Sequence, residues 1–215
     1  MKNAICSWSG GKDCCYAMME AIKMGYNPVV LINMMDVDGI TSRSHGLPVH
    51  LLRKQAISMN IELLTIPTSS IEYETNFVNA LKKAKEDYQL QAIIYGDIDL
   101  IAHREWQERI CHIVGLEPVL PLWERKRSEI ATEILENGIE NIVVSCNETM
   151  GQKYLGKVYN KEMIKELENQ GICPCGEDGE FHSFVINSPL HQSKIKITEN
   201  SFRFENGFHF IDWKS

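Results

Sequence analysis

The side chains best suited to chemistry near the start of the chain belong to the sequence Ser-Gly-Gly-Lys-Asp-Cys at residues 9–14. Two adjacent glycines allow a backbone to approach a phosphate closely, and the lysine adds a positive charge. Asp13 would repel a polyphosphate, so we expect it to have a structural role or to hold magnesium. The segment is neither a Walker loop nor a Gly-x-Gly-x-x-Gly fingerprint. On composition alone, a turn that binds nothing stays open as the alternative.

Later segments place further polar side chains next to apolar runs. Gly96 and Asp97 follow a short buried run, and His103 with Arg104 opens the helix after it. The sequence Gly-Glu-Asp-Gly-Glu-Phe-His-Ser-Phe at residues 176–184 brings three carboxylates into a tight turn before a strand. Taken singly, His103 with Arg104 is more typical of a solvated helix start, and residues 176–184 of a solvated acidic turn, than of a site.

The elements that must position these residues follow an alternation of apolar runs and stretches of helical period, which predicts a parallel α/β sheet. In such a sheet the ligand site lies at the carboxyl ends of the strands, where helix N-termini point N–H groups outward. Residues 9–14 fall at such a point. Strands are predicted at residues 3–8, 28–34, 61–67 and 92–95, and helices up to residue 24 and at 49–59, 74–88 and 102–114.

The pattern restarts after Pro118 and Pro121, and we place a domain boundary near Trp123. The prediction is an α/β nucleotide-binding domain at residues 1–123 and a smaller α+β domain at 124–215. Asn206-Gly207 is a strong two-residue hairpin signal. The later predicted elements are helices at 127–137 and 160–170, strands at 139–146 and 181–187, and alternating runs around 194–197 and 202–210.

The 215 residues include 22 Lys plus Arg against 29 Asp plus Glu, a net charge of −7. Nucleic-acid binders need clustered basic side chains for phosphate contacts, so this charge argues against nucleic acid as a partner. The basic run at 124–127 is better explained as a solvated helix start than as an RNA contact. No apolar run approaches the ~18 residues of a membrane helix, and the short apolar stretch before Ser9 leads us to expect no signal peptide. We expect a soluble, cytoplasmic protein that uses no membrane.

The seven cysteines are an odd number in a chain without an export signal, which indicates reduced thiols rather than a disulfide scaffold. Cys173 and Cys175 have a Cys-x-Cys spacing without a second pair, which is weak evidence for zinc. Cys14 and Cys15 lie at a helix N-terminus, which lowers the pKa of a thiol. We nevertheless expect them to be small residues packed beneath a nucleotide, and the remaining three to lie in the core.

The early Ser-Gly-Gly-x-Asp sequence resembles the pyrophosphatase loop (PP-loop) of ATP-binding enzymes that adenylate a substrate. Together with Gly-Glu-x-Gly-Glu-Phe-His, it resembles the diphthine–ammonia ligase family over residues 9–184. Ser44-His45 and residues 121–123 match further positions of that family. Cys14 departs from the family pattern, since many PP-loops carry serine there and a thiol is a weaker donor. The resemblance implies a Rossmann-like, doubly wound parallel sheet of the PP-loop type with a smaller C-terminal α+β domain.

Members of that family convert diphthine, a modified histidine on elongation factor 2, into diphthamide. The resemblance implies that ATP activates the diphthine carboxylate as an acyl-adenylate, releasing pyrophosphate, and that ammonia then displaces AMP. Expected cofactors and partners are ATP, magnesium, ammonium and a diphthine-bearing elongation factor, with a homodimer as the assembly considered. On this interpretation Glu177 and Glu180 hold ammonium and remove its proton, because only neutral ammonia is nucleophilic.

The residues expected to act follow from this resemblance. The expected catalytic residues are Asp13, Glu177, Glu180 and His182. The expected ATP-binding residues are Ser9, Gly10, Gly11, Lys12, Asp13, Cys14, His45, Gly96, Asp97, His103 and Arg104, with Asp13 and Asp97 as magnesium ligands. Three alternatives stay open: the same chemistry on another carboxylate, an RNA-modifying adenylating enzyme, and an ATP-binding module without catalysis.

Overall fold

Five parallel strands form the first of two sheets in the computed structural model of the protein, which describes residues 1–197 and 201–213. They are β1 (Lys2–Ser7), β2 (Tyr26–Met35), β3 (Glu62–Pro67), β4 (Ala92–Ile94) and β5 (Glu117–Val119). Their order is β3-β2-β1-β4-β5, so the chain steps outward from β1 to β3 and then crosses to β4 on the other side. The predicted Rossmann-like parallel sheet is confirmed, and its switch point lies between β1 and β4.

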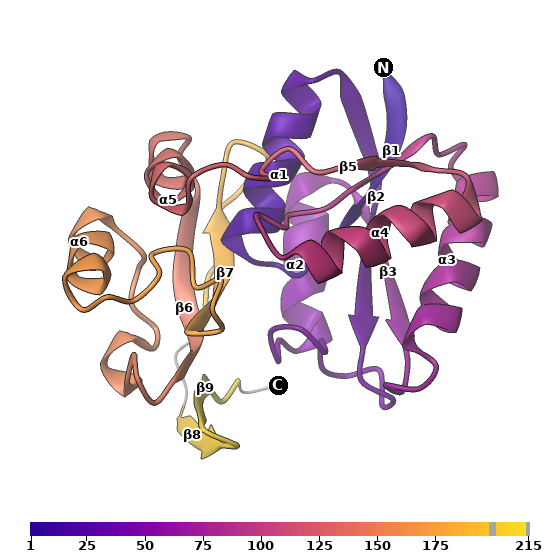
Figure 1. Cartoon of the computed structure of the whole chain (residues 1–215). Coiled ribbons are helices and arrows are strands. Elements are labelled where there is room, and N and C mark those ends of the chain that lie inside the picture. The colour runs from indigo at the N-terminus through magenta and orange to yellow at the C-terminus, as the bar shows by residue number, and fades with distance from the viewer. Residues whose placement is uncertain (198–200, 214–215) are drawn as a thin grey trace.

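Two pairs of helices cover the faces of this sheet (Figure 1). The helices are α1 (Lys12–Lys23), α2 (Val49–Met59), α3 (Tyr73–Asp87) and α4 (Ile101–Val114). Successive residues of β1 point to opposite faces, so Cys6 packs in the core of α1 and α2 while Ile5 packs in the core of α3 and α4. Both faces are therefore buried, which is why these strands are continuously apolar.

The second sheet is antiparallel and has the order β7-β6-β9-β8. Its strands are β6 (Glu140–Asn147), β7 (Phe181–Asn187), β8 (Phe202–Glu205) and β9 (Phe208–Ile211), and the helical elements of this part are α5 (Arg127–Glu136), η1 (Gln152–Tyr154) and α6 (Lys161–Asn169). Asn206 and Gly207 have φ angles of 51° and 81° in the turn between β8 and β9. The predicted two-residue hairpin is thereby confirmed.

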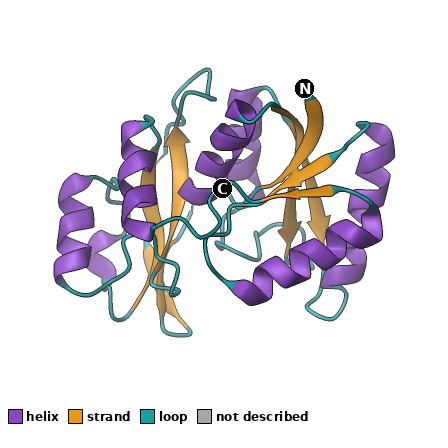
Figure 2. Cartoon of the chain, turned by 45° about the horizontal axis from the view of Figure 1, so that its top comes forward, coloured by secondary structure: helices purple, strands orange, loops and turns teal. Residues whose placement is uncertain are grey.

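The two sheets share one hydrophobic core, because α1 and α2 lie between them (Figure 2). Buried side chains of β1, α1 and α2 belong to the same cluster as those of β6 and β7. Gln55 of α2 is fully buried there and donates to the carbonyls of Gly10 at 2.9 Å and Val185 at 2.8 Å. Trp8 Nε1 completes the set by donating to Gln55 Oε1 at 2.8 Å. The β7 strand is thus fixed against the loop that follows β1.

Two segments differ from the sequence prediction. Strand β5 was not expected, because Pro118 at its centre cannot donate to a ladder. It is tolerated because β5 is the edge strand and pairs with β4 alone. Residues 194–197 are not a strand, although Ile195 N–H donates to the carbonyl of Ile186. The proposed boundary near Trp123 falls between the two sheets, after β5 and before α5.

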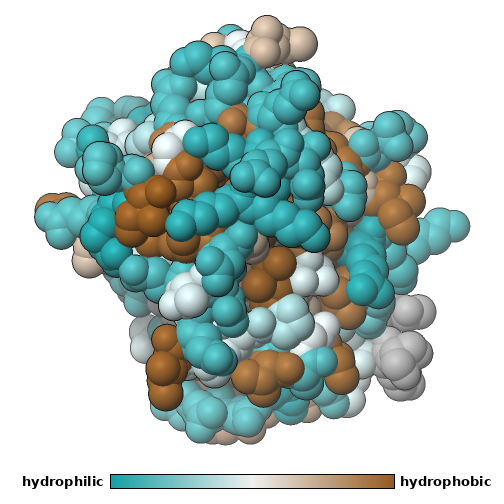
Figure 3. Space-filling model, turned by 90° about the vertical axis from the view of Figure 1, so that its right-hand side faces the viewer, coloured by the Kyte–Doolittle hydropathy of each residue, from teal (hydrophilic) through white to brown (hydrophobic). Residues whose placement is uncertain are grey.

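The face on the α3 and α4 side is mostly hydrophilic, with apolar side chains in separate small groups (Figure 3). The most exposed large apolar side chains include Ile71, Ile57 and Val37, at 95%, 76% and 71% exposure. None of the helices in the described part of the chain is both long and apolar enough to cross a membrane.

Candidate active site

A cavity of about 570 Å³ opens at the carboxyl ends of β1 and β4. This is the switch point of the parallel sheet, the usual place for a ligand in an open α/β fold. The volume lies within the range of ligand-binding pockets, about 300–1,000 Å³. The wall opposite the parallel sheet comes from the second sheet, through the turn before β7 and its first residues. The two sheets therefore build one site together.

The loop after β1 is packed more tightly than its predicted role required. A Cβ atom on Gly11 would lie 2.6 Å from His45 Cε1, and one on Gly10 would lie 2.8 Å from Leu52 Cδ2. Gly10 also has a φ of +86°, which favours glycine. Neither glycine lines the cavity. Packing against the protein alone accounts for both glycines, whether or not their amides approach a phosphate.

Lys12 is 2% exposed and is held by the protein on several sides. Its Nζ donates to Asp13 Oδ2 at 2.8 Å and to the carbonyl of Cys175 at 2.5 Å, and lies 5.0 Å from the ring centroid of Phe181. Burial by itself lowers the pKa of Lys12, but Asp13 and further acidic groups outweigh it, so the net shift is upward. The ammonium group therefore stays charged and joins the β1 loop to the turn before β7.

Two aspartates face the cavity from the carboxyl ends of β1 and β4. Asp13 Oδ1 is buried and has no hydrogen-bond partner among the described residues. Asp97 is fully engaged, since His103 Nδ1 lies 2.8 Å from its Oδ1 and Gln107 Nε2 donates to its Oδ2 at 2.6 Å. The hydrogen bond to Asp97 raises the pKa of His103, which outweighs the lowering effect of burial. An unpartnered oxygen at Asp13 suits a cation, because magnesium takes one or two carboxylates and completes its shell with phosphate and water.

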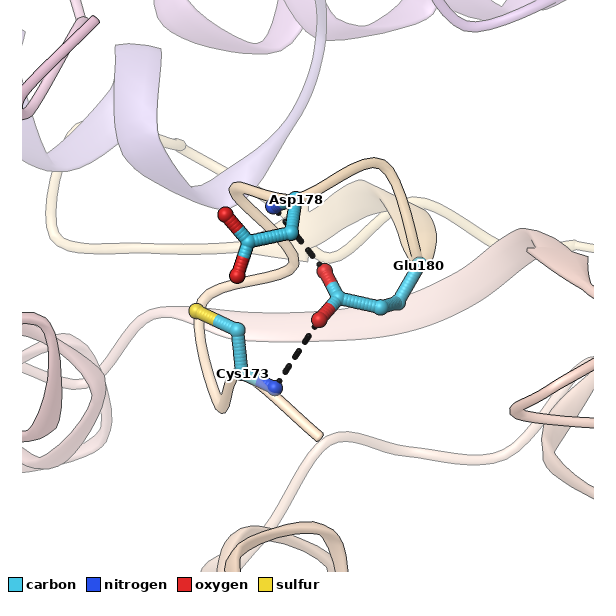
Figure 4. Close-up of side chains that lie close together, drawn as sticks. All are labelled: Cys173, Asp178 and Glu180. Carbon is cyan, nitrogen blue, oxygen red and sulfur yellow. Dashed lines mark hydrogen bonds between the residues drawn. The ribbon is translucent and has the colours of Figure 1, made fainter. Parts of the chain in front are cut away.

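The two glutamates of the turn before β7 occupy different places. Glu177 lines the cavity, and burial, followed by the charge of Asp13, raises its pKa to about 7. Glu180 does not line the cavity. Its two carboxylate oxygens accept the N–H groups of Cys173 and Asp178, each at 3.0 Å (Figure 4). The expectation that both glutamates face one site therefore differs from the structure, because Glu180 is used to close the turn.

Among the described residues, one cluster of potential metal ligands has all its ligand atoms within 4.8 Å: Cys173, Asp178 and Glu180. Arg127 already contacts two of its members, since its Nη1 lies 2.9 Å from Asp178 Oδ2 and 3.5 Å from Cys173 Sγ. The Cys175 thiol donates instead to the carbonyl of Arg127 at 3.0 Å. Each member of the cluster therefore has a partner within the protein: Asp178 and Cys173 contact Arg127, and Glu180 accepts two backbone N–H groups.

His45 and His182 form a stacked pair in the cavity wall, with ring centroids 4.5 Å apart and planes inclined by 23°. Burial lowers the pKa of both rings, to about 4 for His182. Lys12 lowers both further. His45 Nδ1 lies 3.1 Å from the carbonyl of Ser183, so a neutral ring with its proton on Nδ1 donates there and leaves Nε2 as an acceptor. The pair consists of two neutral imidazoles.

Three aromatic rings form the apolar end of the cavity on the α3 and α4 side. Trp106 lies 5.4 Å from Phe77 and 6.0 Å from Tyr73 between ring centroids. Trp106 packs against the core between the sheet and helices α3 and α4, and it also lines the cavity. A flat apolar surface of this kind suits a nucleotide base or another planar group.

Sequence reasoning missed two polar residues at the site. Gln107 is 5% exposed, binds Asp97, and leaves its own Oε1 buried without a partner in the described structure. The signal was available, because His103 and Gln107 are four residues apart and share one face of α4. Ser183 accepts the Lys12 N–H at 3.1 Å, at the N-terminus of α1. No sequence pattern links residues 171 positions apart.

The structure brings ten of the predicted residues to the cavity wall and leaves four outside it. Arg104 is one of the four, since its guanidinium lies 4.9 Å from the ring centroid of Trp123 and its Nε donates to Glu108. The other three are Gly10, Gly11 and Glu180. The residues that line the cavity are Ser9, Lys12, Asp13, Cys14, His45, Gly96, Asp97, His103, Glu177 and His182.

Similarity to known proteins covers both sheets. Residues 1–118 match the family model described as the diphthamide synthase N-terminal domain, and residues 126–215 match the diphthamide synthase C-terminal domain. A diphthine–ammonia ligase of Danio rerio is 28% identical, over 93% of this chain and 89% of that protein. The diphthine–ammonia ligase of Homo sapiens is 26% identical, over 88% of this chain and 80% of its own length. That of Schizosaccharomyces pombe is 24% identical, over 89% of this chain and 35% of that longer protein.

A solved structure, a predicted subunit of tRNA methyltransferase from Methanocaldococcus jannaschii, superposes with a TM-score of 0.50 at 16% identity. It covers 88% of this chain and 98% of its own, and this likeness shows the fold alone. The family models together account for nearly the entire chain. The chain therefore belongs to the diphthamide synthase family and is an enzyme of the class of ATP-dependent ligases that form a carbon–nitrogen bond.

Proposed function

We propose that the protein converts diphthine on elongation factor 2 into diphthamide, using ATP and ammonia. One observation carries this proposal: a nucleotide-sized cavity at the switch point receives a carboxylate with a raised pKa, that of Glu177, from the second sheet. A module that only bound ATP would have no use for such a group. An enzyme that must take a proton from the attacking nitrogen beside a bound nucleotide would use it as a base.

ATP would bind with its base against the aromatic end and its phosphates toward α1. The N-terminus of α1 and the cation of Lys12 favour negative charge there. The hydrogen bond to Asp97 raises the pKa of His103, which favours the protonated form of the imidazole near these phosphates. The fit of magnesium rests on the free oxygen of Asp13, and Asp97, whose oxygens contact His103 and Gln107, would be the second carboxylate. Magnesium would neutralise charge that develops on the phosphates.

In the first step a carboxylate oxygen of diphthine attacks the α-phosphorus of ATP. The bond between the α-phosphorus and the bridging oxygen breaks, and pyrophosphate leaves with the electron pair. The product is an acyl-adenylate. Its acyl carbon now carries AMP, which is a far better leaving group than the oxide that the free carboxylate would have to expel. Lys12 is too firmly held to follow the leaving group, so its contribution is a fixed positive charge in a water-poor place.

In the second step neutral ammonia attacks the acyl carbon and AMP leaves with the electron pair of the carbon–oxygen bond. The nitrogen then carries one proton too many, which the Glu177 carboxylate accepts. A base works best when its pKa lies near the operating pH, and the pKa of Glu177 is about 7. The neutral imidazole of His182 lies in the same wall and offers an acceptor for a hydrogen of ammonia.

The nucleotide product tests this proposal. The protein is incubated with ATP, magnesium, ammonium and elongation factor bearing diphthine, and AMP is separated from ADP by chromatography. We expect AMP and pyrophosphate in amounts that depend on the acceptor. ADP would mean that a different phosphorus is attacked. If ATP binds but AMP never forms with this acceptor, other carboxylates are screened under the same conditions. AMP formation with one of them would mean a different acceptor, and its absence with all of them would mean an ATP-binding module without catalysis.

A further inference from the structure

Arg127, the first residue of α5, lies outside the cavity but contacts the loops that supply it from both sheets. Its Nε and Nη2 donate to the two oxygens of Asp99 at 2.7 and 2.8 Å. Its Nη1 donates to both oxygens of Asp178, at 3.0 and 2.9 Å. A guanidinium can serve two carboxylates in this way because its five N–H donors form a planar, rigid fork.

The two aspartates that Arg127 binds are near neighbours of the cavity carboxylates. Asp99 follows Asp97 by two residues in the loop after β4, and Asp178 follows Glu177 directly in the turn before β7. The backbone of Arg127 is fixed as well, since its carbonyl accepts the Cys175 thiol at 3.0 Å. Its position at the start of α5 is electrostatically unfavourable for a cation, because a helix N-terminus is the positive end of the dipole. Helix stability therefore does not account for an arginine at this position, whereas its contacts with the two loops do.

We infer that Arg127 is a positioning residue that sets the distance between the Asp97 loop and the Glu177 turn, and so aligns the ammonia-activating carboxylate with the bound nucleotide. This inference rests on the proposed function. Among the described residues, no other side chain joins these two loops: His103 and Gln107 hold Asp97, while Lys12 of α1 and Glu180 of the turn itself hold the turn. Without Arg127, each loop would keep its other hydrogen bonds, but the side chain that links the two loops would be lost.

The expected effect is selective for the ammonia step. A displacement of about 1 Å can cost a reaction about 100-fold. In Arg127→Ala we expect ammonium-dependent amide formation to fall by about that factor, with a raised ammonium KM, while the affinity for ATP changes little. Arg127→Lys keeps the charge but not the fork, so it should restore only part of the activity.

Arg125 provides a matched control two residues away. Both side chains are 29% exposed, and Arg125 also makes ion pairs, with Glu133 and Glu20, but it does not touch either loop. Arg125→Ala should lower the Tm and leave the ammonium KM unchanged. If Arg127→Ala keeps the ammonium dependence of the wild type, or if Arg125→Ala changes it equally, the inference is wrong.

Amide hydrogen exchange tests the bridge that Arg127 forms between Asp99 and Asp178, and it requires no enzymatic reaction. Cys173 and Asp178 donate their N–H groups to Glu180, so their exchange reports how firmly the turn is held. Exchange should accelerate at residues 97–100 and 173–180 in Arg127→Ala and not in Arg125→Ala. If Arg127→Ala does not fold, Asp178→Ala removes one half of the bridge in its place, at a side chain that is 65% exposed. Wild-type protein that makes no AMP would overturn the proposed function, whereas unchanged exchange would overturn the bridge.

Discussion

The loop after β1 and the turn before β7 both contain glycines and both bring a carboxylate to the same cavity, but they are held there by different means. The β1 loop is positioned by topology: any loop at that end of a central parallel strand opens at the switch point. The turn before β7 belongs to an antiparallel sheet, for which no such rule exists. It reaches the cavity because Lys12, Glu180 and Arg127 hold it. The first region therefore tolerates changes in its supports better than the second.

The carboxylates of the two regions also differ in electrostatics. Glu177 has a pKa raised to about 7, chiefly by burial and then by Asp13. Glu180, three residues later, accepts a backbone N–H hydrogen bond with each of its two carboxylate oxygens. One acid in the turn is left available for proton transfer and the other is used as structure. The comparison teaches that residue type and spacing do not distinguish a reacting carboxylate from a supporting one.

The largest expected effect is that of Asp13→Asn, in the β1 loop. It removes the free carboxylate oxygen and weakens the hold on Lys12, so AMP formation should fall about 100- to 1,000-fold, as when a fixed electrostatic group is lost. Acceptor-dependent AMP release measures this, with Asp87→Asn, an exposed residue at the end of α3, as control. A variant that retains more than half of the wild-type rate would remove Asp13 from the chemistry.

Glu177→Gln should distinguish most clearly between the function of the turn before β7 and that of the β1 loop. We expect amide formation to fall by about 100-fold, the usual cost of losing a general base, while adenylation continues. In the wild type the ammonium-dependent rate should rise as the pH increases through about 7, because Glu177 loses its proton there. This rise in the pH–rate profile should be absent in the variant. The pH–rate profile at a fixed concentration of free ammonia checks this. An unchanged rise would assign the titration to another group.

Glu180→Gln should act on stability rather than on chemistry. Glutamine has one acceptor oxygen for two backbone N–H groups, so one buried donor loses its partner, at about 1–3 kcal/mol of unfolding free energy. Urea denaturation measures the loss, and the turnover per folded molecule should stay close to that of the wild type. If the variant is as stable as the wild type but inactive, Glu180 belongs with Glu177 in the reaction.

The smallest expected effect is the pH dependence of stability caused by Glu177. Its folded pKa, about 7, lies above the unfolded value, so the folded state binds a proton that the unfolded state releases between about pH 4 and 7. The contribution of Glu177 to the free energy of unfolding is therefore fully present below its unfolded pKa, and it is lost as the pH rises through 7. Glu177→Gln should therefore be about 1 kcal/mol more stable than the wild type at pH 8, allowing for partial exposure, and equal to it near pH 4. Equal stabilities at pH 8 would mean that Glu177 ionises at its ordinary pKa.

Most of the fold could be predicted from the sequence. Buried parallel strands are continuously apolar, and the helices between them show a clear 3.6-residue period, so β1 to β4 and the helices were found within a few residues. Strand β5 was missed because Pro118 argues against a strand, and only its place at the sheet edge permits it. The hairpin at Asn206-Gly207 was found because its turn requires those residues locally.

The sequence by itself determined the parallel sheet, the position of residues 9–14 at the end of its first strand, and the set of side chains available for chemistry. These properties are local, because periodicity and strand-to-helix turns are encoded by neighbouring residues. Only the tertiary structure decided which glutamate faces the cavity, that Ser183 meets the N-terminus of α1, and that Arg127 joins the two loops. Those contacts join residues 28 to 171 positions apart, and their geometry depends on how two sheets pack around α1 and α2.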